Sequence, residues 1–330
     1  MFGAPAWLIW LLACTGCLAV ELRRSATFSA PDEIRGALLA PDGRQVYSWG
    51  ERLRLWDLAT GKSAVLAEGP FGEGGCLLAA DPDGRHDLIL QQGLSLGRLA
   101  AYGPPLWQSV PIDREIGMHD CLAARLFGRS GILVIHRGAQ VRFYQRPARK
   151  GDAWPVRDIY SIYTPSYQGG LALADIDQDG RTDILCGNYW IRSPEAFELP
   201  WRLFAINLWF EERESATMRL AAAPGGRVIM AQSHLADGKV GIFTPTQDPR
   251  QLWKVEVKTR AKFPHGLLVW PDGTLMVGEN NGSASRLLLW SPESRAPKVL
   301  MLNQGVLALL AARDQVIAAC RRSLIVFKVK

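Results

Sequence analysis

The chain has 330 residues, a formal net charge of +6 and 48% hydrophobic residues, enough to bury a large core. Its basic residues are scattered, with no block of five or more like charges, so we expect no nucleic-acid partner, because nucleic-acid binding calls for a clustered basic stripe. The sequence contains neither a glycine-rich phosphate loop nor a Gly-x-Ser-x-Gly nucleophile elbow, which disfavours nucleotide chemistry.

Residues 1–19 are predicted to be a signal peptide, because they contain an apolar run too short for a comfortable membrane span. The usual basic start is missing, since the first Lys or Arg is Arg23. Two outcomes stay open. Residues 11–14 resemble a bacterial lipobox, which would place a lipid on Cys14, whereas cleavage after Ala19 would release a free protein. We expect export to an extracellular or periplasmic location, with membrane contact only through such a lipid.

From residue 20 onward, seven segments share one plan of three apolar strands, with a Gly/Asp turn after the first and an aromatic residue ending the third. Successive segments lie about 40–50 residues apart, which is typical of four-stranded propeller blades. They begin near Gly36, Cys76, Cys121, Gly170, Arg219, Gly266 and Gly305. The sequence therefore predicts an all-β fold, a seven-bladed β-propeller, over residues 20–330 as a single domain.

The two ends of the chain are predicted to share one blade. The last repeat stops after its third strand near Lys330, while residues 25–29 before the first repeat form an orphan strand. Pairing these segments would remove the exposed edges of an open ring. The aromatic residues that end the third strands, such as Trp56, Phe243 and Trp290, are expected to pack between blades rather than to stack on sugars.

Residues 175–183 carry the most specific motif, Asp-x-Asp-x-Asp-Gly-x-x-Asp. Calcium prefers about six to eight hard oxygen ligands, and Gly180 permits the sharp turn that brings them together. The expected ligands are the carboxylates of Asp175, Asp177, Asp179 and Asp183 with the backbone carbonyl of Arg181. Cys186 stands where an EF-hand needs a glutamate, so the flanks are predicted to be strands. The alternative is a solvated Asp-Gly turn without an ion.

Residues 169–194 resemble the FG-GAP/VCBS repeat family, including its bacterial secreted members. The resemblance is carried by residues 170–174, 182–187, 188–190 and 192–194. It implies a propeller blade that holds structural calcium in the turn between its first two strands. Residues 81–87 are similar to a second copy of the loop with two residues deleted, and we expect no tightly held ion there.

Four cysteines follow the leader, and each lies in an apolar strand: Cys76, Cys121, Cys186 and Cys320. No two of them have the close spacing of a zinc motif, so we expect buried free thiols. Cys76 and Cys121 begin the innermost strands of successive blades, which leaves a bridge between them as an alternative that the sequence does not decide.

Polar residues are expected at the end of the ring opposite the calcium loop, where the innermost strands begin. Concave openings with a few converging polar groups often bind ligands. The expected rim residues are Arg35, His119, Gln168, Asn188, Tyr189, His234 and His265. The three histidines of this set, with Gln168, are candidate ligands for a second divalent metal. The alternative is that each histidine is an ordinary turn or rim residue.

Two classes of function fit this sequence. The first is an exported, calcium-stabilised, non-catalytic propeller that binds a protein or a glycan at its rim. The second is a metal-dependent carbohydrate lyase or dehydratase, in which the metal polarises a carbonyl while His136 or Tyr189 abstracts a proton. The sequence favours the binding module, because it shows no sharp catalytic signature, and it does not identify the ligand.

Overall fold

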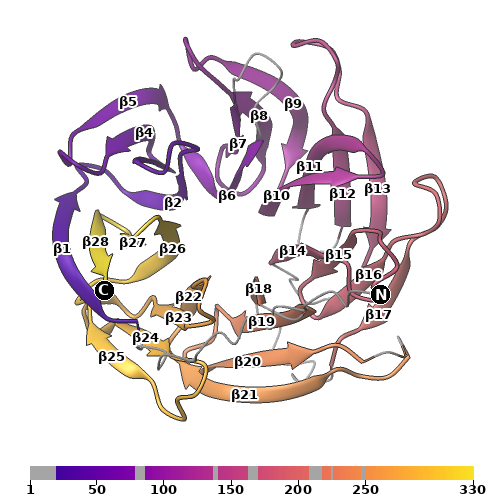
Figure 1. Cartoon of the computed structure of the whole chain (residues 1–330). Coiled ribbons are helices and arrows are strands. Elements are labelled where there is room, and N and C mark those ends of the chain that lie inside the picture. Colours follow the sequence, from indigo (N-terminus) through magenta and orange to yellow (C-terminus); the bar gives the residue numbers. More distant parts are fainter. Residues whose placement is uncertain are drawn as a thin grey trace, which may run out of the picture.

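The computed structural model of the chain describes residues 20–78, 86–136, 140–162, 170–207, 218–223, 226–246, 248 and 250–330. In these residues the strands form seven four-stranded antiparallel sheets, which surround a central axis as the blades of a ring (Figure 1). The predicted seven-bladed β-propeller is thereby confirmed. The leader, residues 1–19, lies outside the described residues.

In the first six blades the strands follow chain order from the axis outward, and in the seventh the N-terminal strand β1 is outermost. The first three blades are β2 (Ile34–Leu39), β3 (Gln45–Gly50), β4 (Arg52–Asp57) and β5 (Ser63–Glu68); β6 (Phe71–Leu78), β7 (Asp87–Gln92), β8 (Gly97–Tyr102) and β9 (Ser109–Ile116); and β10 (Met118–Leu126), β11 (Arg129–His136), β12 (Gln140–Gln145) and β13 (Val156–Ser161). The next two are β14 (Leu171–Ala174), β15 (Asp183–Cys186), β16 (Tyr189–Arg192) and β17 (Arg202–Ala205); and β18 (Met218–Ala223), β19 (Arg227–Gln232), β20 (Gly238–Thr244) and β21 (Lys254–Ala261).

The sixth blade is β22 (Pro264–Val269), β23 (Leu275–Glu279), β24 (Arg286–Trp290) and β25 (Lys298–Met301), with the short 3₁₀-helix η2 (Gly282–Ala284) before β24. The seventh is β26 (Val306–Ala312), β27 (Gln315–Cys320), β28 (Ser323–Val329) and β1 (Leu22–Ser29). No helix in the part of the chain that the structure describes has the length and apolarity needed to cross a bilayer.

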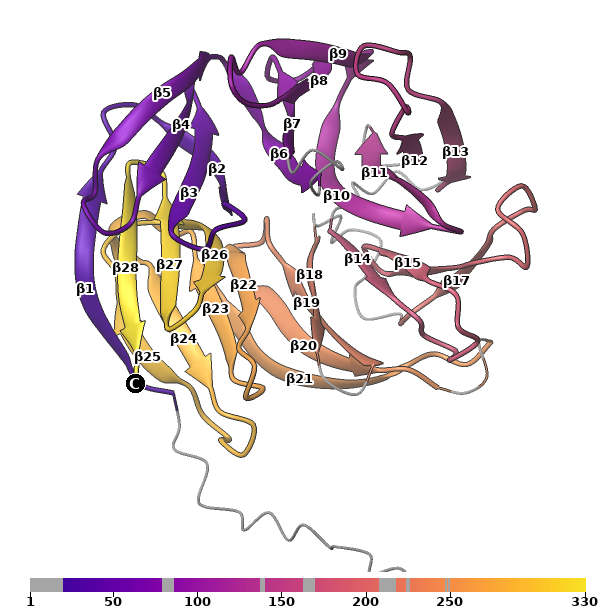
Figure 2. The same ribbon diagram turned by 45° about the horizontal axis from the view of Figure 1, so that its top comes forward.

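The ring is closed by strands from both ends of the chain. The N-terminal strand β1 pairs antiparallel with β28, from Leu22 opposite Val329 to Ser29 opposite Ser323. Figure 2 shows β1, β28, β27 and β26 side by side in one blade. This pairing covers the edge that β28 would otherwise expose, and it confirms the predicted closure.

The first strand of every blade lies next to the axis. Neighbouring inner strands contact one another around the ring, and β26 contacts β2 where the circle closes. We call the end where the inner strands begin the mouth end, and the end that holds the turns from first to second strands the loop end. The turn between β14 and β15, which contains the aspartate motif, belongs to the loop end.

Apolar side chains fill the spaces between blades. The described residues form seven buried clusters, one between each pair of neighbouring blades. The rings of Trp56, Tyr144, Phe243 and Trp290 are all buried in these clusters. Their expected role in packing between blades is confirmed, and it fits the large area that aromatic side chains bury.

The cysteines correct one expectation. Cys76 of β6 and Cys121 of β10 form a disulfide between neighbouring blades, so the prediction of free thiols was wrong for these two. Their Cα atoms lie 5.4 Å apart, a separation that suits a disulfide. The ring brings the inner strands this close, and sequence separation did not reveal it. Cys186 and Cys320 are free and buried, as expected.

Candidate functional site

Two adjoining cavities lie at the mouth end. The axial cavity, about 270 Å³, runs along the centre of the ring and receives residues from all seven inner strands. The mouth cavity, about 780 Å³, lies beside it between β6, the β7–β8 loop, the start of β10 and the β19–β20 loop. Arg35 and Glu73 line both cavities. Volumes of this order are typical of small-ligand sites.

The structure brings three predicted histidines to these cavities. His119 and His234 line the mouth cavity, and His265 lines the axial cavity. The rings of His234 and His265 have centroids 5.2 Å apart. Burial lowers the pKa of each imidazole, and the Arg219 charge adds to the effect; the pKa of His265 falls to about 3. All three imidazoles are therefore neutral near pH 7.

Arg219, at the start of β18, supplies a charge that acts on all three histidines. Its Nε atom is buried and makes no hydrogen bond with the described residues. Arg219 also makes no ion pair with a described carboxylate within 4.0 Å. A guanidinium placed in this way can bind a ligand anion, because its N–H groups form a planar fork that donates hydrogen bonds to both oxygens of a carboxylate.

Two acidic residues share the mouth with Arg219. Asp120 accepts hydrogen bonds from the backbone N–H groups of Cys121 at 2.9 Å and Leu171 at 3.0 Å, which joins the third blade to the fourth. Burial raises the pKa of Asp120, although Arg219 and these N–H groups act in the opposite direction. Glu73 is exposed at the rim. The mouth thus has acidic groups as well as basic ones.

Arg35 lies at the rim as predicted, but it is already paired. Its guanidinium donates to the carbonyl oxygen of Phe71 and to Glu33, each at 3.2 Å. These bonds fix the side chain across the entrance to the axial cavity, where Arg35 is a lining residue. Its charge is partly balanced by Glu33, which leaves Arg219 as the less compensated cation.

Other predicted rim residues lie elsewhere. Asn188 is buried and donates to the carbonyl oxygen of Asn207, and Tyr189 packs against the cluster between the third and fourth blades. Neither residue lines the two cavities. His136, a candidate base, is buried and accepts a hydrogen bond from the backbone N–H of Gly117 at Nδ1. Gln168 lies outside the described residues.

The mouth does not present a preformed metal centre in the described part of the chain. There, the one group of three or more His, Cys, Asp or Glu side chains with ligand atoms within 4.8 Å of one another is Asp175, Asp177 and Asp179. The mouth histidines do not belong to such a group. Their joint role as metal ligands stays a prediction.

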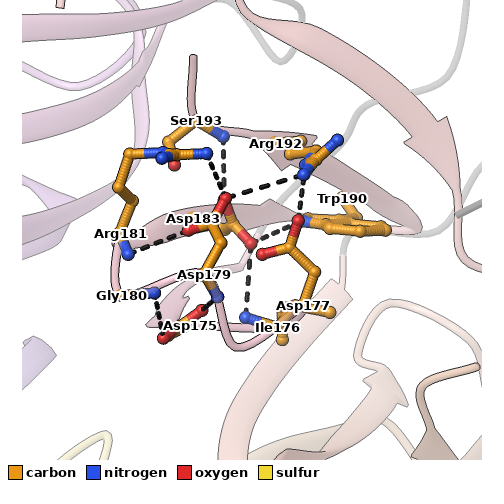
Figure 3. Close-up of polar contacts among 10 residues, drawn as sticks. All are labelled: Asp175, Ile176, Asp177, Asp179, Gly180, Arg181, Asp183, Trp190, Arg192 and Ser193. Atoms are coloured by element: carbon orange, nitrogen blue, oxygen red, sulfur yellow. Dashed lines mark hydrogen bonds and ion pairs between the residues drawn. The ribbon is translucent and has the colours of Figure 1, made fainter. Parts of the chain in front are cut away.

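At the loop end, the aspartate motif folds into the tight turn that its spacing predicts (Figure 3). Asp175 accepts hydrogen bonds from the N–H groups of Asp179 at 3.1 Å and Gly180 at 2.9 Å. Gly180 has a φ of +83°, a conformation that favours glycine. Three carboxylates therefore converge on the turn, and three oxygen donors of this kind suit a hard cation such as Ca²⁺.

Asp183 lies beneath this turn. It is fully buried and accepts hydrogen bonds from the Trp190 indole at 2.9 Å and from the backbone N–H groups of Ile176 at 3.2 Å and Ser193 at 2.8 Å (Figure 3). Burial raises the pKa of its carboxyl, while the three N–H donors act against that rise. Asp183 ties the loop to β16, and its predicted role as a calcium ligand stays a prediction.

Two arginines balance the charge of the loop. Arg192 Nε lies 2.5 Å from an oxygen of Asp177, and Arg181 pairs with Asp179 (Figure 3). The backbone carbonyl of Arg181 is the predicted ligand, and its guanidinium turns back onto the loop. A cation bound among the three carboxylates would compete with both guanidinium groups. The second aspartate loop, in residues 81–87, lies largely outside the described residues.

The sequence interpretation missed Glu73, Asp120 and Arg219. Each lies near the start of an inner strand, the position that singled out Arg35 and His119. The same positional rule, applied to charged residues in every repeat, would have found them. In the sequence, Arg219 was identified only as the start of a repeat and not as a candidate site residue.

Comparison with protein-family models finds no match for this chain, and comparison with curated protein sequences also finds no match. Among solved structures, the chain is similar to the β-propeller domain of Cps50 (Swd1) from Myceliophteria thermophila. The TM-score is 0.64 and the sequence identity 11%, over 94% of this chain and 100% of that chain. At this identity the likeness establishes the fold alone, and that fold is a seven-bladed β-propeller.

Proposed function

We propose that this protein is an exported, calcium-stabilised propeller of the FG-GAP/VCBS type that binds a protein or glycan at its mouth without catalysing a reaction. The observation that carries the proposal is the convergence of His119, His234, His265 and Arg219 on two joined cavities at one end of a closed ring. Polar groups that converge in a concave opening are typical of binding sites.

Export is supported by the disulfide between Cys76 and Cys121, because disulfides form and persist mainly in oxidising compartments. The apolar leader at residues 1–19 points the same way. Mass spectrometry of the mature protein would test this part of the proposal. A mature chain that starts at Cys14 with a lipid, or at residue 20 without one, supports export, whereas an uncleaved Met1 in a reduced protein contradicts it.

The calcium site is supported by the geometry of Asp175, Asp177 and Asp179. The three carboxylates would hold the ion, and Arg181 and Arg192 would turn away as their partners are taken. Calcium should raise the melting temperature by mass action, and a chelator should lower it. Asp177→Asn should abolish the response, while Asp237→Asn, on the exposed β19–β20 loop, should retain it. No response in the wild-type protein would contradict the site.

The binding role is tested by a screen of peptide and glycan arrays with the wild-type protein and two variants. His119→Ala alters the mouth cavity, and Arg202→Gln alters an exposed side chain beside the aspartate loop. Ligands of the mouth should be lost in His119→Ala and retained in Arg202→Gln. Ligands with the opposite pattern would move the binding site to the other end of the ring.

A metal-dependent carbohydrate lyase or dehydratase is the second candidate, favoured by the close approach of two neutral imidazoles, His234 and His265. Against it, the two predicted bases, His136 and Tyr189, line neither cavity, and His136 is buried and accepts a hydrogen bond from the Gly117 N–H. Metal analysis of the purified protein and the absorbance of unsaturated product from uronate glycans would decide. The enzyme would be favoured over the binding module if the purified protein contains stoichiometric transition metal and forms product. His119→Ala should then lose both the metal and the product formation.

A further inference from the structure

We propose that the mouth recognises an acidic peptide segment of a protein ligand, with one carboxylate seated on Arg219 and apolar neighbours seated against Leu94 and Leu96. This inference rests on the proposed binding function and narrows its ligand to one chemical class.

The cationic part of the site is Arg219. It lines the axial cavity at the start of β18, its Nε is buried, and the described residues provide neither a hydrogen bond to that atom nor an ion pair within 4.0 Å. The charge of Arg219 acts on Asp120, which lines the same cavity, but the two side chains form no ion pair within 4.0 Å. A buried N–H without an acceptor is costly, and a ligand carboxylate could offset that cost through paired N–H···O bonds.

Three histidines share these cavities with Arg219. His119 and His234 line the mouth cavity, and His265 lines the axial cavity. The acceptor capacity of Asp120 is engaged by two backbone N–H groups. Glu73 stands exposed on the rim, where it repels a carboxylate placed beside His119 or His234. Arg35 is already paired with Glu33, so Arg219 is the cation on which we place the ligand carboxylate.

The apolar part of the site is the β7–β8 loop. Leu94 and Leu96 line the mouth cavity with 53% and 54% of their surfaces exposed. The buried Gln91 holds this loop, because its amide donates to the carbonyl of Leu94 at 2.8 Å while its oxygen accepts from Met118 N–H at 2.6 Å. Leu94 and Leu96 thus form an apolar surface of the mouth cavity, held in place by Gln91, and the charged Arg35 and Glu73 line the same cavity.

This combination favours a peptide over a glycan. Peptides carry carboxylates and aliphatic side chains within a few residues of each other, which matches Arg219 in the axial cavity and two leucines in the adjoining mouth cavity. Sugars would be expected to pack on an exposed aromatic face, and the aromatic ring that lines the axial cavity, Trp49, is 2% exposed and donates its indole N–H to Gly72. Charge and apolar surface on the ligand should both contribute to binding.

The test uses two short, soluble, labelled peptides that differ only in charge. In one, leucines flank three glutamates; in the other, the same leucines flank three glutamines. Fluorescence polarisation with the full chain should show the glutamate peptide binding at least about tenfold more tightly, since a charge-assisted bond is being compared with a neutral one. Added salt should reduce this preference.

Variants test whether the preference for the glutamate peptide arises from residues at the mouth. Arg219→Gln should abolish the difference between the peptides, Arg219→Lys should restore part of it, and Arg202→Gln at the loop end should leave it unchanged. Leu94→Asp changes an exposed loop residue, so it should fold normally, and it should weaken the glutamate peptide more than the glutamine peptide by repulsion. That variant keeps the test decisive if Arg219→Gln does not fold.

The remaining outcomes separate this inference from the proposed function. Equal affinity for both peptides, with loss in Leu94→Asp, would overturn the acidic preference and leave a peptide-binding mouth. Binding of polygalacturonate but of neither peptide would overturn the inference and support the glycan branch of the proposed function. If the mouth binds none of these probes and the array screen finds no ligand sensitive to His119→Ala, both fail.

Discussion

The two ends of the ring handle charge in different ways. At the loop end, Asp183 has three N–H donors, and Asp177 and Asp179 have arginine partners. At the mouth end, Arg219 has no described ion-pair partner, and it lies near neutral histidines. Charges that are balanced within the chain hold the fold together, whereas a charge left uncompensated in a cavity leaves room for a ligand. The loop end therefore contributes to the fold, and the mouth end is where we propose that a ligand binds.

The largest effect is expected from the disulfide that braces the mouth. Replacing Cys76 and Cys121 together by Ala should lower the free energy of unfolding by about 4 kcal/mol, on the chain-entropy estimate for the 45-residue separation. Denaturant unfolding measures the loss. The peptide map of the unreduced wild-type protein should show the two cysteines linked; four free thiols after residue 20 would contradict the brace.

At the loop end, Asp183→Ala should cost about 3 kcal/mol, because it leaves three buried N–H donors without their acceptor. Asp183→Asn keeps one acceptor oxygen and should cost less. Denaturant midpoints of the two variants give the comparison. A loss in Asp183→Ala below about 1 kcal/mol would show that these hydrogen bonds do not hold the loop.

Whether the sequence predicted a feature depends on how far apart in the chain the interacting residues lie. The blade starts, the aromatic packing and the pairing of residues 25–29 with the last repeat follow from local patterns that recur, and the structure confirms them. The Cys76–Cys121 bond depends on how closely two inner strands approach, a distance that only the closed ring determines.

The candidate sites show the same division. Turn chemistry in a single segment correctly predicted the convergence of Asp175, Asp177 and Asp179. The position of Asn188, in contrast, depends on a hydrogen bond to Asn207, beyond the end of its own blade. The importance of Arg219 depends on what surrounds it from other blades, which a linear pattern does not contain.

A smaller change at the loop end would sharpen the comparison. Arg192→Gln removes a cation that lies 2.5 Å from Asp177. Without calcium the variant should lose about 1 kcal/mol of stability, since the pair is partly exposed. With calcium it should bind the ion more tightly than the wild-type protein, because a competing charge is gone. Calorimetric titration measures both affinities; weaker calcium binding in the variant would contradict the competition.

The effect that is smallest near neutral pH, and that grows in acid, concerns stability at the mouth. The pKa of His265 is lowered from 6.5 to about 3 by burial, by Arg219 and by His234. Between these values the unfolded chain binds a proton that the folded chain does not, so stability falls as pH falls from about 6.5 toward 3. His265→Asn should make this fall shallower. Unfolding midpoints at several pH values measure it, and identical slopes in both proteins would show that His265 is not held neutral.

Hydrogen–deuterium exchange with calcium and with the glutamate peptide tests the division between the two ends most directly. We predict that calcium slows exchange in residues 175–183 and leaves the mouth unchanged. The peptide should slow exchange in the β7–β8 loop and at the starts of β10, β18 and β22, and leave the aspartate loop unchanged. Slower exchange at the mouth with calcium, or at the aspartate loop with the peptide, would contradict the account.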